Sequence, residues 1–139
     1  MIAHIMVDGA AAAIDFYIKA FGAKELIRID GRDGRVLHAE VSVQGSTIML
    51  GAAEAPLFRA PTTIGGTTVG LHVFVDDVDS LADRAVAAGA ELLQPRADQF
   101  HGDRTSILRD AYGHVWIFLT HLKHLTSDEV SRRAQELLR

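Results

Sequence analysis

The chain contains no cysteine, and this absence excludes several classes of site. Without a thiol there is no disulfide bridge, no thiolate nucleophile and no zinc site built on cysteine. Disulfides are also rare in reducing compartments, so we expect a cytoplasmic protein.

An excess of charge of one sign is missing as well. The 14 lysines and arginines stand against 18 aspartates and glutamates, which gives a formal net charge of -4. Proteins that bind nucleic acid or an anionic membrane surface usually carry a basic patch, so we expect neither partner. The first apolar stretch lacks a basic leader and is interrupted by Asp8 and Asp15, which argues against a signal peptide or a membrane span. The 48% hydrophobic and 23% charged residues are instead typical of one globular domain.

The two halves of the chain resemble each other. The stretch HIMVDGAAAAIDFYIKAFGAKEL, which begins at His4, matches HVFVDDVDSLADRAVAAGAELL, which begins 68 positions later at His72. The same offset of 68 separates GSTIML, from Gly45, and GHVWIFL, from Gly113. A repeat of this length indicates a tandem duplication in which each half forms one supersecondary unit.

Each half predicts a strand, a helix and then three strands. In the first half, residues 2–7 are apolar, and residues 10–21 carry apolar side chains at helical spacing until Gly22 ends the helix. Three strands follow, separated by turn residues. In the second half we expect the helix at residues 79–88.

A separate helix is expected at the C-terminus, where Thr126 and Glu129 form a capping box. We therefore predict an α+β chain with a single domain at 1–124, followed by a helix at 125–139. The domain consists of module one at 1–52, a linker or flap at 53–69 and module two at 70–124.

Two tandem βαβββ units strongly resemble the vicinal oxygen chelate superfamily, which includes glyoxalase I, extradiol dioxygenases and bleomycin-resistance proteins. More narrowly, LHVFVDDVD, AVAAGAE, DQFHGDR and RDAYGHVW look like the PhnB-like branch. The chain departs from the usual Asp-Pro-Phe-Gly-His turn by having Ala111 and Tyr112, which affects a turn. The resemblance covers about residues 2–121 and implies a curved mixed-sheet cup around a cavity. The two units of one cup come from one chain or from two chains of a dimer, and the sequence is compatible with both.

Metal-dependent members of this superfamily hold a divalent ion in the cup, and the resemblance places the ligands at Ile2, Met49, Gly70 and Ile117. None of these residues has a side-chain nitrogen or oxygen donor, whereas a divalent ion typically takes three or more protein ligands. We therefore expect no metal and no other cofactor.

His4 and His72 leave an alternative open, because they lie two residues further along the same strand faces. They bind a ligand, serve as structural histidines, or hold a metal in an unusual register if His38 and Glu40 also face the cup.

The predicted ligand site is apolar with a few polar groups. Such a lining suits a mid-sized, partly apolar or aromatic molecule. The predicted ligand-binding residues are His4, Met6, Met49, His72, Phe74, Phe100, Arg104 and Ile117.

We favour a metal-independent protein that binds a small molecule, in a sequestration or resistance role. The alternative is an enzyme of the glyoxalase or dioxygenase type, or an isomerase or lyase, that uses histidine as metal ligand or general base. Leu57, Phe58 and Ile64 in the linker, together with the apolar stripe of the last helix, need a covering surface, so we expect a homodimer.

Overall fold

The computed structural model describes residues 1–54 and 56–138 and contains two four-stranded sheets, one in each half of the chain. Module one consists of β1 (His4–Val7), α1 (Ala10–Phe21), β2 (Lys24–Asp30), β3 (Val36–Val43) and β4 (Ser46–Ala52). Module two consists of β5 (Gly70–Phe74), α3 (Val78–Ala87), β6 (Glu91–Asp98), β7 (Asp103–Arg109) and β8 (Val115–His121). The linker contains a short helix, α2 (Pro61–Ile64), and α4 (Ser127–Leu137) follows module two. The predicted α+β class and the duplicated βαβββ order are confirmed.

The duplication extends to strand order and register. The sheets have the orders β1-β4-β3-β2 and β5-β8-β7-β6, and in each the first pair is parallel while the others are antiparallel. His4 pairs with Met49 in module one, and His72 pairs with Ile117 in module two. Residues that match in the repeat therefore occupy equivalent places in their sheets.

One hydrophobic core joins the two modules through their helix-covered faces. Tyr17 and Phe21 of α1 are fully buried, and the Phe21 ring lies 5.0 Å from the rings of both Trp116 and Phe118 on β8. Gly22 ends α1 in the left-handed conformation, with a φ of 66° that favours glycine. In module two, the side chain of Asp77 caps α3 by accepting from the backbone N–H groups of Asp79 and Ser80.

Strand β3 departs from simple alternation at its first residues. Alternation through RVLHAEVSV places Leu37 with Ala39 on the core side, but Val36 is buried and Leu37 is half exposed. The pairing with β2 shifts register between Ile29 and Asp30, so that Asp30 pairs with Val36. This irregularity turns Val36, and not Leu37, into the core.

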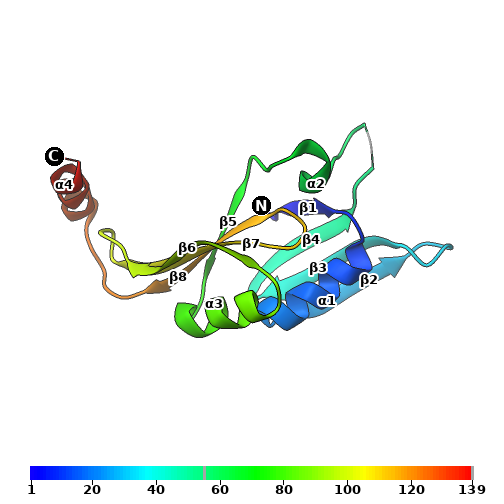
Figure 1. The fold of residues 1–139 in the computed structure, drawn as a ribbon, viewed down its shortest axis with the longest axis horizontal. Coiled ribbons are helices and arrows are strands. Elements are labelled where there is room, and N and C mark those ends of the chain that lie inside the picture. Colours follow the sequence, from blue (N-terminus) through cyan, green and yellow to red (C-terminus); the bar gives the residue numbers. More distant parts are fainter. Residues whose placement is uncertain (55, 139) are drawn as a thin grey trace.

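The modules lie end to end along the long axis of the molecule, with α1 and α3 in contact on one side (Figure 1). No strand of one sheet pairs with the other among the described residues, so the cup is unclosed in a single chain. Helix α4 lies beyond the far end of module two. None of the helices within residues 1–54 and 56–138 is long and apolar enough to cross a membrane.

Candidate functional site

Each sheet has one face covered by its helix and a second face, here called the open face, that the helix leaves uncovered. On β1, Ile5 and Val7 belong to the core, and alternation turns His4 and Met6 toward the open face. The register of β1, β4 and β3 brings further side chains to the same face. The open face of module one carries His4, Met6, Ile27, Ile29, His38, Glu40 and Met49.

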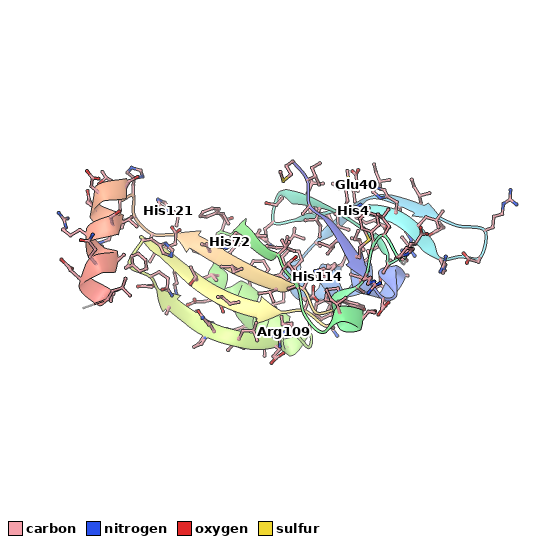
Figure 2. The ribbon with its side chains drawn as sticks, turned by 90° about the horizontal axis from the view of Figure 1, so that it is seen from above. His4, Glu40, His72, Arg109, His114 and His121 are labelled. Atoms are coloured by element: carbon pink, nitrogen blue, oxygen red, sulfur yellow. The ribbon has the colours of Figure 1, made fainter. Side chains whose placement is uncertain are left out.

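Three ionisable side chains gather on this face. The rings of His4 and His38 meet edge to face with centroids 5.5 Å apart, and His38 Nε2 lies 3.8 Å from Glu40 Oε1. From the linker, the ring of Phe58 lies 6.3 Å from that of His4. Figure 2 shows His4 and Glu40 close together on module one. The sequence singled out both histidines, and strand alternation correctly indicated that His38 and Glu40 share a face.

Gly51 leaves room for the His4 ring on the sheet surface. A Cβ atom at this position would lie 2.9 Å from the backbone oxygen of Leu37 and 3.6 Å from His4 Nε2. A side chain here would therefore crowd the strand and the imidazole together. The role of Gly51 in making room for His4 was not predicted from the sequence, because a glycine within a strand does not reveal what approaches it.

The electrostatics of the cluster favour a neutral His4. Burial of the imidazole and, to a smaller degree, the nearby His38 lower the pKa of His4 from its usual value. A neutral imidazole has one nitrogen that donates and one that accepts a hydrogen bond. His4 is therefore suited to accept a hydrogen bond or a proton at neutral pH.

A cavity of about 390 Å³ adjoins this cluster, between the edge strands β1 and β5 and beneath the linker. Its lining is mostly apolar. Buried His114 fixes one wall, because its Nε2 lies 2.8 Å from the backbone oxygen of Met6 and donates to it. The lining includes His4, Met6, Arg59, Ile64, Leu71 and His114.

The open face of module two carries a second group of predicted site residues. His72 and Phe74 alternate with buried Leu71 and Val73, and Ile117 lies beside His72 in the register. Phe74 remains 61% exposed. Figure 2 shows His72 on module two, well apart from His4 on module one. In one chain the two open faces are therefore separate, and His4 and His72 do not face each other.

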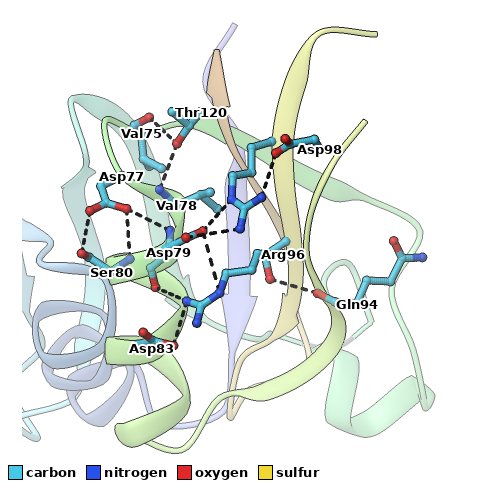
Figure 3. A network of polar contacts seen from close by, with 12 residues as sticks. Val75, Asp77, Val78, Asp79, Ser80, Asp83, Gln94, Arg96, Asp98 and Thr120 are labelled. Carbon is cyan, nitrogen blue, oxygen red and sulfur yellow. Dashed lines mark hydrogen bonds and ion pairs between the residues drawn. The ribbon is translucent and has the colours of Figure 1, made fainter. Parts of the chain in front are cut away.

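Arg104 differs from the expected ligand contact, because the structure places it on the helix-covered side of module two. Its guanidinium donates to Asp79 Oδ1 at 2.8 Å and to Asp98 Oδ1 at 2.8 Å. Figure 3 shows Asp79 within a network that also includes Arg96 and Asp98. The hydrogen bonds to Asp79 and Asp98 raise the pKa of Arg104, and Arg104 lowers the pKa of Asp79. Arg104 joins α3 to the sheet and is not brought to the open face.

Phe100 lies in the turn between β6 and β7, beside α4. It is half buried, with its ring 5.4 Å from that of His101, and its backbone oxygen lies 3.5 Å from Arg133 Nη1. The turn between β6 and β7 is at the end of module two that faces away from module one (Figure 1). The structure does not bring Phe100 together with His4 and Met49.

The metal site of the resembled superfamily does not fit these residues. Met49 and Ile117 occupy matching central positions on the two open faces, and neither has a nitrogen or oxygen donor. Within residues 1–54 and 56–138, no three histidine, aspartate or glutamate side chains are arranged to hold a metal ion.

Comparisons with known proteins agree with this fold. A model of the family described as "Glyoxalase/Bleomycin resistance protein/Dioxygenase superfamily" matches residues 1–118. The uncharacterized protein Mb0911c of Mycobacterium bovis is 40% identical over 131 residues, which cover 91% of this chain and 86% of that protein. The structure of TioX from Micromonospora sp. ML1 superposes with a TM-score of 0.71 and 29% identity, covering 91% of this chain and 98% of TioX. A PhnB protein from Bacillus cereus shares the fold with a TM-score of 0.62 at 18% identity, covering 86% of this chain and 98% of that protein.

Proposed function

Because the chain belongs to the glyoxalase/bleomycin resistance protein/dioxygenase superfamily, we propose that it is a metal-independent cytoplasmic protein that binds a small, partly apolar or aromatic molecule on its open faces. Family membership alone does not give the activity, because one fold carries many functions. The proposal therefore rests on the chemistry of the site.

The observation that carries the proposal is the composition of the open faces. Met49 and Ile117 stand at their centres, flanked by Met6 and Phe74, with His4 and His72 as the neighbouring polar groups. Ligand pockets are mostly apolar with a few polar groups that set orientation, which is the pattern here. Methionine side chains adapt to irregular shapes, so the site suits a ligand that is bound by packing.

A second copy of the chain completes the site in this proposal. The modules of one chain share a core through their helices and lie end to end, so neither open face covers the other. Ile27 and Ile29 on module one remain about half exposed, and Phe74 on module two is more exposed still. Apolar area of this kind is typical of a surface that is covered in an assembly. A homodimer in which module one of each copy faces module two of the other forms two equivalent cups.

The test is calorimetric titration of a molecule found by thermal-shift screening. Replacing His4 and His72 with alanine should weaken binding by about 1–3 kcal/mol if each loses one hydrogen bond. Met49→Arg should abolish binding, because the arginine fills the cup and its charge is poorly solvated. Met49→Leu is the matched control and should retain most of the affinity. Unchanged affinity in Met49→Arg, with an intact fold by circular dichroism, would place the site elsewhere.

Metal independence is tested separately by elemental analysis of protein purified without chelator. The proposal predicts less than stoichiometric zinc, nickel, iron or manganese. One metal ion per chain that is lost in the His4→Ala, His38→Ala variant would overturn it.

A second candidate function is proton transfer by His4 to or from a bound substrate. It is favoured by the lowered pKa of His4 and by the contact of His38 with both His4 and Glu40. A general base needs to be neutral at the working pH and within reach of the substrate proton. The test is NMR in deuterated water, which detects exchange of a carbon-bound proton of the bound ligand for deuterium. Exchange by the wild type that is lost in His4→Gln would establish proton transfer. If the wild type shows no exchange, the protein only binds the ligand.

A further inference from the structure

The cavity of about 390 Å³ between β1 and β5 is a different place from the centres of the two open faces. It is lined by β1, β5 and the linker of a single chain, and its lining does not include Met49, Phe74 or Ile117. Of the open-face residues, His4 and Met6 also line the cavity, because the cavity and the open face of module one meet along β1. Ligand pockets usually have volumes of roughly 300–1,000 Å³, so this cavity suits a small ligand.

The linker is fixed over the cavity by contacts with both modules. Pro61 is buried, and the hydroxyl of Thr62 donates to Asp8 Oδ2 at 2.5 Å, directly after β1. On the side of module two, a Cβ atom on Gly113 would lie 2.7 Å from Pro61 Cβ, so the start of α2 packs closely on the turn before β8. Figure 1 shows α2 beside β1. Arg59 immediately precedes this anchored segment and lines the cavity.

The charge around the cavity is of one sign. The lining residues that the structure describes include no aspartate or glutamate, although the chain contains 18 of them. Of these described lining residues, only Arg59 carries a lysine or arginine side chain. The arginine ion pairs within residues 1–54 and 56–138 involve five other arginines and not Arg59. The cavity therefore has a guanidinium at its side and no carboxylate of its own to pair with it.

The other polar side chains of the lining are engaged or uncharged. His114 Nε2 is used in the hydrogen bond to Met6 O, and the hydroxyl of Thr67 donates to Val69 O at 3.3 Å. The lowered pKa of His4 keeps its imidazole neutral at neutral pH, so it can donate or accept a single hydrogen bond. Arg59 thus supplies one positive charge, which matches a ligand with one negative charge.

We propose that this cavity binds a small monocarboxylate with an apolar body, whose carboxylate pairs with the guanidinium of Arg59. The guanidinium presents parallel N–H groups that fit the two oxygens of a carboxylate, which makes arginine a specific partner for this group. The apolar body packs between the edge strands, against Ile5 of β1 and Leu71 of β5 and beneath Ile64 of α2. One chain supplies the whole site, so the proposal goes beyond the two-copy cup and does not depend on it.

The test is calorimetric titration at neutral pH with cinnamate, an aromatic monocarboxylate, and with cinnamamide, its neutral amide. Both molecules have the same apolar body, so the comparison isolates the negative charge. The wild type should bind one cinnamate per chain and should bind cinnamamide about tenfold more weakly, because the amide does not form the charged pair with arginine.

Arg59→Gln removes the positive charge and should lower the affinity for cinnamate to about that for cinnamamide, while the affinity for cinnamamide stays unchanged. Arg59 is exposed and has no carboxylate partner among the described residues, so circular dichroism should show an unaltered fold. Arg32→Gln is the matched control. It makes the same change of net charge in the turn between β2 and β3, away from the cavity lining, and should alter neither affinity.

Three results would overturn the proposal. They are no binding of cinnamate to the wild type at millimolar concentration, equal affinity of the wild type for cinnamate and cinnamamide, and unchanged cinnamate affinity in Arg59→Gln. Because Arg59 is not part of the proposed cup, each of these results would refute the carboxylate site and leave the proposed function standing.

Discussion

Asp110 accepts four hydrogen bonds inside the protein, and its replacement by alanine should be among the most destabilising single changes. Asp110 Oδ2 accepts from the Tyr17 hydroxyl at 2.6 Å and from Trp116 Nε1 at 2.9 Å. Its Oδ1 accepts from the backbone N–H groups of Tyr112 at 2.8 Å and His114 at 3.0 Å. The carboxylate thereby ties α1 of module one to the turn that begins β8 of module two.

The magnitude follows from the donors that the substitution leaves without a partner. Tyr17 and Trp116 are both fully buried, so water cannot replace the lost acceptor without opening the core. Each unsatisfied buried donor costs about 1–3 kcal/mol, so Asp110→Ala should lower the free energy of unfolding by about 3–5 kcal/mol. That is a large part of the 5–15 kcal/mol that is typical of a domain. Asp110→Asn keeps an acceptor oxygen and should lose less.

The assay is urea unfolding followed by fluorescence of the one tryptophan, which lies at the site of the change. Adding Tyr17→Phe to Asp110→Ala removes one of the stranded donors, so the double variant should lose less free energy than the sum of the single variants. A loss below about 0.5 kcal/mol for Asp110→Ala would refute the assignment of Asp110 as the link between the modules.

Two further predictions concern His4 and Arg104. The pKa of His4 is lowered in the folded chain, so the unfolded chain binds more protons than the folded chain as the pH falls through about 6.5, and acidification lowers the free energy of unfolding. His4→Leu should reduce this loss between pH 7.5 and 5.5, measured by urea unfolding at each pH. The same pH dependence in wild type and His4→Leu would contradict the lowered pKa. Arg104→Met should lower the free energy of unfolding by no more than about 1 kcal/mol, because its ion pairs with Asp79 and Asp98 are partly exposed. Ligand affinity should not change in Arg104→Met, since the guanidinium lies on the helix-covered side; a tenfold weaker affinity by calorimetry would contradict this placement.

The sequence predicted the repeat, the element order and the alternation that turns His4 and His72 to open faces. These features depend on local periodicity, which a sequence displays directly. The role of Asp110 was not predicted, because its partner Tyr17 is 93 residues away and only the packing of α1 on β8 brings them together. Arg104 was expected at the ligand, but the carboxylates of Asp79 and Asp98 are brought beside it by the fold.

The register shift in β3 and the separation of the two histidines could not be predicted from local sequence patterns either. The shift that turns Val36 inward depends on how β2 and β3 pair, and neither strand indicates it alone. The separation of His4 and His72 follows from the shared core of the modules, which the repeat itself does not reveal.

Complementation between two variants tests whether module one of one copy and module two of another form each ligand site. Met49→Arg disables the module-one half and Ile117→Arg disables the module-two half, so neither variant should bind ligand alone. After the two chains are unfolded together and refolded, about half of the dimers are mixed, and each mixed dimer contains one unaltered cup. We therefore expect about one quarter of the sites to bind ligand with wild-type affinity in calorimetry. If the mixture binds no ligand although mixed dimers are present by mass spectrometry, the ligand site does not combine modules from the two copies.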